Sequence, residues 1–360
     1  MDIDKNIGTA QTPPSSFYTS ESIFKKSKSI FENSYQFVCH QSELEKSTSI
    51  PFNLFKDWLD IPLVITKENN NIFCLSNVCT HRGNIICNKK NHKNKLVCNY
   101  HGRSFNLDGS VNHAPGFKET KNFPSKDDSL DKSINLINWN GLLFINTGQN
   151  KSILSGLNEI GSIVDWYPFE KLSFDQGASN TYTIDAHWAL YCENYLEGLH
   201  ITYVHAGLSS DIDNQSYATT LLEHAVLQIA KSSKKEDSLG GAGKINNIST
   251  NDIYALYFWL FPNIMINFYK WGISVNVIEP LDKEKTRIRF ISLPIKGYKQ
   301  SSGDSNSVDH IELEDQRVVL NVQKGIKSKF YDRGRYSAQH EKGTHHFHLL
   351  LSKYLKEIKL

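Results

Sequence analysis

The sequence is poor in the features that mark secreted, membrane-spanning and nucleic-acid-binding proteins. Its six cysteines are too sparse among 360 residues for a disulfide scaffold, so we expect a reducing compartment, the cytoplasm. The 40 basic and 38 acidic side chains nearly cancel, which gives no electrostatic case for nucleic acid or an anionic membrane as the main partner. Internal repeats and the glycine-rich fingerprints of flavin and nicotinamide sites are also missing.

Long hydrophobic runs are missing too. The longest apolar stretch, residues 253–266, is broken by Pro262 and is shorter than the roughly 20 residues of a membrane-spanning helix. Residues 1–20 are polar and look like neither a secretory signal nor an arginine-rich transit peptide. The composition, 39% hydrophobic and 22% charged, indicates a globular protein with a buried core, and the length favours two domains or one large one.

The hydrophobic pattern divides the chain into three parts. Residues 1–35 indicate an N-terminal helical segment, because apolar side chains recur at helical spacing around 23–31. Residues 36–150 alternate in short runs separated by turn residues, which predicts a small all-β domain. A linker is expected near 147–156, and a larger domain over 151–360.

The third part mixes strands with helices. Aromatic and β-branched residues predict long strands over 251–281 and 285–295. Helical patterns cover 307–326 and 344–358. The polar stretch 231–247 is expected to be a mobile loop. An α+β protein follows from these elements.

Two short motifs each pair a cysteine with a histidine. Cys79 and His81 form C-x-H, and Cys98 and His101 form C-x-x-H after sixteen intervening residues. Structural zinc is one interpretation, but zinc sites usually pair like with like. One cysteine and one histidine from each motif suit a two-iron cluster in which one iron takes both thiolates and the other both imidazoles. We therefore predict a Rieske [2Fe–2S] cluster held by these four residues.

A second constellation follows in the next domain, where Glu197, His200 and His205 form E-x-x-H-x-x-x-x-H. Glu197 and His200 would share a helix face. His200 and His205, five apart, would diverge on an ideal helix, so we expect the helix to loosen after His200. Two histidines and one carboxylate form the facial triad of non-haem Fe(II) oxygenases. Two unrelated core or surface histidines are the alternative interpretation.

The carboxylate of such a triad can come from far along the chain. The stretch HIELEDQRVVLNVQKG offers Asp315, with Glu312 and Glu314 as rivals. The residues alone do not choose among these three.

The two motifs in this order resemble the catalytic (alpha) subunit of Rieske non-haem iron oxygenases over nearly the whole chain. The stretches NYLEGLHITYVHAGL, FPNIMINFYKWGISVNVIEPL, EDQRVVLNVQKGI, YDRGRYS and HHFHLLL resemble choline monooxygenase-like members. The resemblance implies an all-β Rieske domain and a helix-grip catalytic domain, an antiparallel sheet with a long C-terminal helix, on which the N-terminal segment packs. Arg103 stands where tryptophan is frequent in the family, and the sequence offers no interpretation of this departure.

The resemblance also implies the site. His200, His205 and Asp315 would hold mononuclear Fe(II). The enzyme would be a homotrimer in which the cluster of one subunit faces the iron of the next. Glu197 would bridge them where most of the superfamily has aspartate, with His101 or His81 on the other side. By its spacing, Asn194, one helical turn earlier, either helps to orient the site or is an ordinary residue near a helix N-terminus.

The implied activity is O₂-dependent hydroxylation of a C–H bond with electrons from a separate NAD(P)H-dependent reductase or ferredoxin. The implied substrate is a small quaternary or tertiary ammonium compound that is choline-, carnitine- or betaine-like, and the product is an aldehyde or a demethylated amine. Such a cation favours aromatic faces. The best candidates are Trp271, Tyr269 and Tyr203, and the remaining ones are Trp259 and Phe268.

Two other functions remain open from the sequence. One is a Rieske oxygenase that hydroxylates an aromatic or heterocyclic substrate. The other is a Rieske electron-transfer protein without oxygenase activity. His345, His346 and His348 resemble a metal cluster in spacing, but their helical context favours ordinary packing and surface roles.

Overall fold

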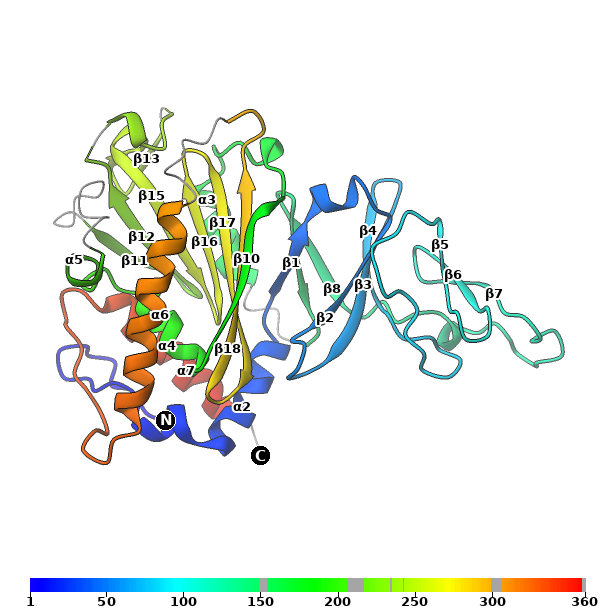
Figure 1. The fold of residues 1–360 in the computed structure, drawn as a ribbon, viewed down its shortest axis with the longest axis horizontal. Helices are drawn as coiled ribbons and strands as arrows, with labels where there is room; N and C mark the ends of the chain where they lie inside the picture. Colours follow the sequence, from blue (N-terminus) through cyan, green and yellow to red (C-terminus); the bar gives the residue numbers. More distant parts are fainter. Residues whose placement is uncertain (149–153, 206–216, 234, 242, 299–305, 358–360) are drawn as a thin grey trace. The chain divides into compact units, whose positions relative to one another are not determined.

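The computed structural model describes residues 1–360 except 149–153, 206–216, 234, 242, 299–305 and 358–360 (Figure 1). The chain forms two compact units. The smaller unit is Tyr35–Gln149, and the larger unit combines Met1–Ser34 with Asn150–Leu360. The smaller unit is thus an insertion in the sequence of the larger one.

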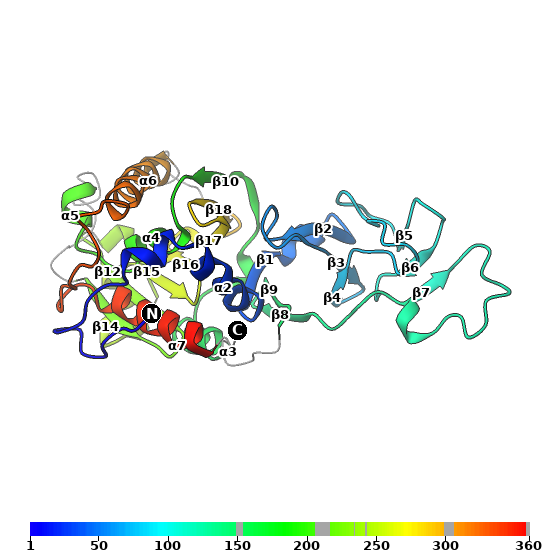
Figure 2. The same cartoon turned by 90° about the horizontal axis from the view of Figure 1, so that it is seen from below.

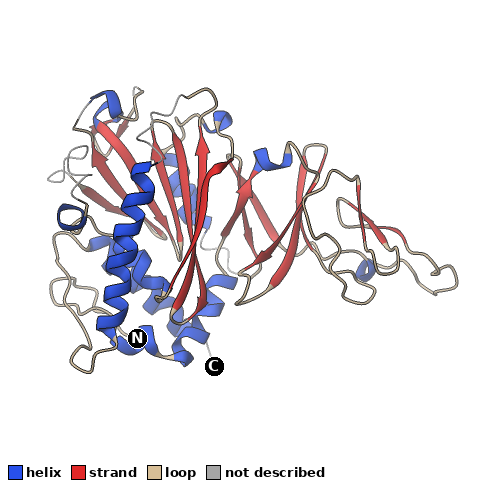
Figure 3. Cartoon of the chain, in the orientation of Figure 1, coloured by secondary structure: helices blue, strands red, loops and turns tan. Residues whose placement is uncertain are grey.

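The smaller unit consists almost wholly of strands and loops (Figure 3). Its described residues form three antiparallel three-stranded sheets, ordered β1-β9-β8, β2-β3-β4 and β5-β6-β7. The strands are β1 Gln36–His40, β2 Ser49–Leu54, β3 Ile61–Glu68, β4 Asn71–Ser76, β5 Lys95–Val97, β6 Ser104–Asn106, β7 Val111–His113, β8 Asn135–Trp139 and β9 Leu142–Asn146. The all-β character predicted for this part is confirmed.

One hydrophobic cluster places both motif cysteines in the core of this unit. Cys79 and Cys98 are buried there with Val64 of β3, Leu75 of β4 and Phe105 of β6. The loops that carry the cysteines are therefore anchored between two sheets, while the residues that follow each cysteine reach toward the surface.

The larger unit is built on a seven-stranded antiparallel sheet with the order β10-β18-β17-β16-β15-β12-β11. Four consecutive strands form a meander at its centre, as the aromatic and β-branched pattern predicts. The strands are β10 Asp175–Ile184, β11 Ala218–Leu221, β12 Ala225–Lys231, β15 Ile253–Leu260, β16 Ile264–Tyr269, β17 Gly272–Asp282 and β18 Lys285–Pro294. A separate two-stranded hairpin joins β13 Lys244–Ile245 and β14 Ile248–Ser249.

The larger unit also contains α-helices. They are α1 Ser15–Thr19, α2 Glu21–Glu32, α3 Leu154–Ile163, α4 Trp188–Tyr195, α5 Ile201–Val204, α6 Asn306–Ile326 and α7 Lys342–Glu357. The central α4 contacts α6, α7 and β17, so it lies between the long α6 and the sheet (Figures 1 and 2). This antiparallel sheet with long C-terminal helices confirms the helix-grip expectation and the α+β class.

Some local expectations change. The expected loop over 231–247 carries β13 and a 3₁₀ turn at Lys235–Asp237, while residues 234 and 242 lie outside the described residues. The expected linker near 147–156 overlaps the start of α3, and its residues 149–153 are likewise outside the description. Among the described helices, none has the length and apolar character needed to cross a membrane.

Gly343 fixes the approach of α7 to the end of α4. A Cβ at this position would lie 2.5 Å from the Leu196 carbonyl oxygen and 3.3 Å from Val226 Cγ1. Gly325 of α6 is the matched contrast, because a Cβ there would meet no atom within 4 Å.

We expect Gly343→Ala to destabilise the protein by roughly 1–3 kcal/mol, because the added methyl forces two packed helices apart. Gly325→Ala should be neutral or stabilising by up to about 1 kcal/mol, since alanine favours the helix. Urea unfolding followed by circular dichroism compares the two midpoints. Equal midpoints for the two variants would show that the α7–α4 approach is not tight.

Candidate active site

The two cysteine–histidine loops share one backbone design. In each loop the cysteine N–H donates to the carbonyl five residues later, and a glycine four residues later donates back to the cysteine carbonyl. These bonds join Cys79 with Asn84 and Gly83 (2.8 and 2.9 Å) and Cys98 with Arg103 and Gly102 (2.9 and 3.0 Å). Both glycines adopt positive φ, +70° and +75°, a conformation that glycine reaches without a Cβ penalty.

The four side chains converge in pairs. The buried thiols of Cys79 and Cys98 lie within hydrogen-bonding reach of each other. The rings of His81 and His101 are 4.7 Å apart between centroids and lie nearer to solvent. Two inner sulfur donors and two outer imidazoles are the donor set of a Rieske cluster, so the residues fit a [2Fe–2S] group.

The surroundings tune these donors differently. Burial raises the pKa of the Cys79 thiol. Burial acts in the same direction on Cys98, but hydrogen bonds from the Tyr100 backbone and the Asn84 amide outweigh it, so the pKa of Cys98 is lowered. Burial and the neighbouring His101 lower the pKa of His81, which favours the neutral imidazole that binds metals.

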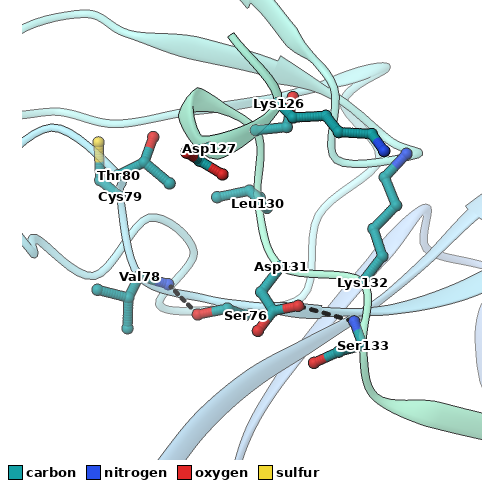
Figure 4. Close-up of a pocket in the computed structure, with 11 residues that line it drawn as sticks. Ser76, Val78, Cys79, Thr80, Lys126, Asp127, Leu130, Asp131, Lys132 and Ser133 are labelled. Carbon is teal, nitrogen blue, oxygen red and sulfur yellow. Dashed lines mark hydrogen bonds between the residues drawn. The ribbon is translucent and has the colours of Figure 1, made fainter.

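A groove of about 750 Å³ lies beside the first loop (Figure 4). Ser76, Val78, Cys79 and Thr80 line one side of it. The segment 126–133 lines the other side with two lysines and two aspartates. Because this mixed-charge groove belongs to the cysteine–histidine unit and presents no convergent set of donors, we do not assign a substrate to it.

The second constellation lies at a break between two helices. Helix α4 ends at Tyr195, residues 196–200 form turns, and α5 begins at Ile201. The expectation that Glu197 and His200 share a helix and that the helix loosens after His200 is therefore wrong, because the break precedes His200. The Glu197 carboxylate accepts hydrogen bonds from the backbone N–H groups of Leu199 and His200, which stabilises this turn and starts α5.

His200, His205 and Asp315 meet at one point. One ligand atom from each lies within 4.8 Å of the others, and no other such group occurs among the described residues. Asp315 Oδ1 is 3.0 Å from His205 Nε2 and 3.6 Å from His200 Nε2. Two imidazoles and one carboxylate facing a common point fit a ferrous ion and leave further coordination positions open.

Each of these three side chains has a supporting partner. Glu197 Oε1 lies 2.6 Å from His200 Nδ1, and Glu314 Oε2 lies 2.8 Å from His205 Nδ1. The Asn194 amide donates to Asp315 Oδ1 over 2.8 Å. Such outer hydrogen bonds fix the tautomer and orientation of metal-binding groups.

The structure separates the three rival carboxylates of α6. Asp315 faces both imidazoles, Glu314 contacts the far nitrogen of His205, and Glu312 accepts a hydrogen bond from Tyr191. Burial lowers the pKa of His205, but Asp315 and Glu314 outweigh it and raise that pKa to about 8.

Five tyrosines form what we call the tyrosine cluster: Tyr195, Tyr217, Tyr254, Tyr257 and Tyr269. Ring centroids of successive members lie 5.9–6.4 Å apart from Tyr195 through Tyr257 and Tyr269 to Tyr254. Tyr217 packs on Gly198, directly after Glu197. Burial, followed by the charge of nearby groups that include Glu312, raises the pKa of Tyr195 and of Tyr269.

The aromatic residues singled out in the sequence are placed unequally. Tyr269 belongs to the tyrosine cluster, and Trp271 stacks on it with centroids 5.2 Å apart. Tyr203 is 82% exposed and is not brought to the cluster. Trp259 and Phe268 are fully buried core residues.

Sequence reasoning missed the other four tyrosines. The alternation of side chains along the strands could have indicated Tyr257. Tyr257 pairs with Asn267, and Asn267 lies two residues before Tyr269, so all three side chains are on the same face of the sheet. Tyr195 OH donates to Asn267 Oδ1 over 2.6 Å, a contact between α4 and the sheet that no local pattern shows.

The C-terminal histidines pack as expected. His345 Nε2 lies 2.7 Å from the Asp4 carbonyl oxygen. His348 is held between Tyr336 and Glu193.

Comparison with known proteins identifies both units. The family description "Rieske [2Fe-2S] domain" matches residues 34–124, and "Ring hydroxylating alpha subunit (catalytic domain)" matches residues 169–357. The chain belongs to the Rieske non-haem iron oxygenases. The protein is therefore an O₂-dependent oxidoreductase whose family carries a Rieske cluster and a mononuclear iron, as the sequence predicts.

Curated relatives place it within the family. The chain is 30% identical to choline monooxygenase of Arabidopsis thaliana over 96% of its own length and 83% of that protein. It is 29% identical to the carnitine monooxygenase oxygenase subunit of Escherichia coli K12, covering 98% and 96% of the two chains. The resemblance to choline monooxygenase-like members is confirmed.

Solved structures share the fold. A quaternary ammonium Rieske monooxygenase superposes with a TM-score of 0.81 at 24% identity, covering 98% of this chain and all of the other. Naphthalene 1,2-dioxygenase from Rhodococcus sp. superposes with a TM-score of 0.77 at 16% identity, covering 97% and 95%.

We expect Asp315→Ala to lose the mononuclear iron and keep the Rieske cluster, so iron falls from about three to about two per chain. Glu312→Gln, one helical turn away, is the matched control and should keep all three. Glu314→Gln should weaken iron binding about 10- to 100-fold through His205. Iron and sulfide analysis with the visible spectrum measures each content. Loss of iron from the Glu312 variant alone would reassign the third ligand.

Proposed function

We propose that this oxygenase hydroxylates a C–H bond of a small quaternary or tertiary ammonium compound and gives an aldehyde or a demethylated amine. The observation that carries the proposal is the tyrosine cluster. Its members Tyr195 and Tyr217 lie near Glu312 and Glu197, the second of which supports His200. The names of the relatives support it, because they act on choline and carnitine.

The tyrosine cluster suits a cation. Each aromatic face contributes about 0.5–2 kcal/mol toward a desolvated ammonium group. The stacked pair of Tyr269 and Trp271 extends the aromatic surface at the end of β16. Quaternary ammonium groups lack N–H donors, so rings and a carboxylate at a distance stabilise them better than directed hydrogen bonds do.

Glu312 favours the cation over a neutral ring. The hydrogen bond between Tyr191 and Glu312 lies one helical turn from the one between Asn194 and Asp315. The Glu312 carboxylate is therefore close to the triad but is not part of it. A carboxylate near a substrate pocket costs desolvation energy unless an opposite charge arrives with the substrate. An aromatic hydrocarbon brings none, so the alternative aromatic substrate is disfavoured.

The remaining residues divide the work. In the proposal Cys79, His81, Cys98 and His101 hold the cluster. His200, His205 and Asp315 hold the iron, and the Asn194 amide keeps the Asp315 carboxylate turned toward both imidazoles. The bound groups supply single-electron transfer and activation of O₂. We propose an N-terminal helical segment over 1–35, a Rieske domain over 36–150 and a mononuclear iron catalytic domain over 151–360.

Electrons must come from another protein, and we propose a separate NAD(P)H-dependent reductase or ferredoxin in the cytoplasm. We also propose a homotrimer in which His101 or His81 of one subunit reaches Glu197 of the next. Glu197 already holds His200 Nδ1 and is partly exposed, which suits a carboxylate that links two imidazoles. A solved relative is described with inter-subunit electron transfer.

The experiment for the substrate class is a screen with a surrogate reductase. We expect choline, carnitine or a betaine to give formaldehyde or aldehyde coupled to O₂ uptake, and neutral aromatics to give none. Glu312→Gln should raise KM for the cation about tenfold or more, because it removes the matching charge, with less effect on kcat. Turnover of a neutral aromatic in preference to all ammonium compounds would refute the proposal.

Glu197→Gln tests the electron route. We expect both metal sites to stay loaded while product formation coupled to O₂ falls at least about 100-fold, because glutamine replaces one of the two acceptor oxygens with an NH₂ group, which donates and cannot accept from the second imidazole. Glu197→Asp, which keeps the carboxylate and loses one methylene, should retain part of the activity. Product and O₂ are measured together with iron content. Normal coupled turnover in the glutamine variant would remove Glu197 from the route.

A further inference from the structure

Arg103 is a buried cation in the Rieske unit. Its side chain is only 3% exposed, and a guanidinium does not deprotonate in proteins. Its single ion-pair partner among the described residues is Asp128, whose Oδ1 lies 3.6 Å from Nη1, beyond a good hydrogen bond. Nε is buried without a hydrogen-bond partner there. The positive charge is therefore only partly compensated.

The shared backbone design of the two loops explains where this side chain goes. Arg103 closes the second loop as Asn84 closes the first. The Asn84 amide donates to Asn99, the residue after the second cysteine, over 3.0 Å. Arg103 Nη1 donates to Thr80, the residue after the first cysteine, also over 3.0 Å. Each closing residue thus crosses to the same position of the opposite loop.

A third segment completes the arrangement. The guanidinium carbon lies 4.6 Å from the centroid of Phe117 and 5.0 Å from that of Phe123. Phe117 also packs edge-on against His81, with centroids 5.2 Å apart. Thr80 in turn donates to the Asp128 carbonyl oxygen over 2.6 Å. Arg103 therefore joins both cluster-binding loops to the segment that packs on His81.

We propose that Arg103 is a positioning residue of the Rieske centre that joins its two loops and raises its reduction potential with a buried positive charge. The potential of such a centre depends on net charge, hydrogen bonding and solvent exposure. One-electron reduction adds a negative charge, so a nearby cation stabilises the reduced form. In the low-dielectric interior this attraction is stronger than it is at the surface.

The contacts of Arg103 place its charge beside the first loop. Nη1 donates to Thr80, which lies between Cys79 and His81 in the sequence. Tryptophan, frequent at this position in the family that the sequence resembles, would supply the ring packing without the charge.

The test is the midpoint potential of the purified holoenzyme, titrated with redox mediators and followed by circular dichroism of the cluster. Arg103→Gln removes the charge, and Arg103→Lys keeps the charge and loses the planar fork. Asp128→Asn removes the compensating negative charge. Arg82→Gln is the matched control, because it removes an exposed cation next to His81 that solvent and salt screen.

We expect Arg103→Gln to lower the ratio of reduced to oxidised cluster at a fixed poise about three- to tenfold, or about 28 to 59 mV at 59 mV per tenfold. Asp128→Asn should shift the ratio in the opposite direction. Arg103→Lys should stay near the wild-type potential, and Arg82→Gln should change it little, with an effect that fades in salt.

A purely structural role predicts another result. Arg103→Gln and Asp128→Asn would then shift the potential in the same direction or not at all, and either outcome overturns the charge proposal. Should Arg103→Gln fail to retain the cluster, the Asp128→Asn shift still decides, because that variant keeps the guanidinium. An unchanged potential in Asp128→Asn with full cluster content refutes the proposal. None of these measurements depends on the substrate.

Discussion

The packing of α4 against α6 is the contact on which the catalytic half of this oxygenase depends. Two side-chain hydrogen bonds join these helices, Tyr191 to Glu312 and Asn194 to Asp315. Each bond joins residues that are 121 positions apart. The two bonds are three residues apart on each helix, so the same alignment of α4 with α6 recurs after one helical turn. This alignment places the carboxylate of Asp315 beside the two histidines that follow α4.

The same alignment assigns different tasks to neighbouring acidic residues. Residues three apart on a helix share a face, whereas adjacent residues point about 100° apart. Glu312 and Asp315 therefore both face α4, and Glu314 turns toward His205 from another side. A short acidic run thus brings one carboxylate to both imidazoles, a second to the far nitrogen of His205 and a third to Tyr191.

Local pattern was enough to predict the long central strands, the two C-terminal helices and the residue types of both centres. The spacing of Cys79, His81, Cys98 and His101 predicted a Rieske cluster, because all four residues lie within two short loops. The meander over β15–β18 followed from aromatic and β-branched runs broken by turns. Asp315 could be chosen as the third ligand only by resemblance. Its partner Asn194 is 121 residues away, and the sequence does not show how two distant helices align with each other.

Other features were beyond local reasoning for the same reason. The turn at 196–200 depends on the Glu197 carboxylate bonding to its own backbone and on Tyr217 packing against Gly198, which only glycine allows at this distance. The tyrosine cluster gathers residues from α4, β15, β16 and the segment before β11, and only Tyr269 of its members was expected. The placement of the Arg103 side chain depends on contacts that the two loops exchange at matched positions, which the sequence of either loop alone does not show.

The two centres differ in the charge that surrounds them. Around the iron-binding point, Glu197, Glu312, Glu314 and Asp315 supply up to four negative charges, and a ferrous ion supplies two positive ones, which leaves an excess of up to two negative charges. An ammonium substrate of the proposed kind would reduce this excess, whereas a neutral ring would not. In the Rieske unit the imbalance is reversed, since Arg103 is only partly matched by Asp128. A buried cation beside the cluster loops favours uptake of an electron, and an excess of carboxylates near the iron-binding point favours the cationic substrate that we propose.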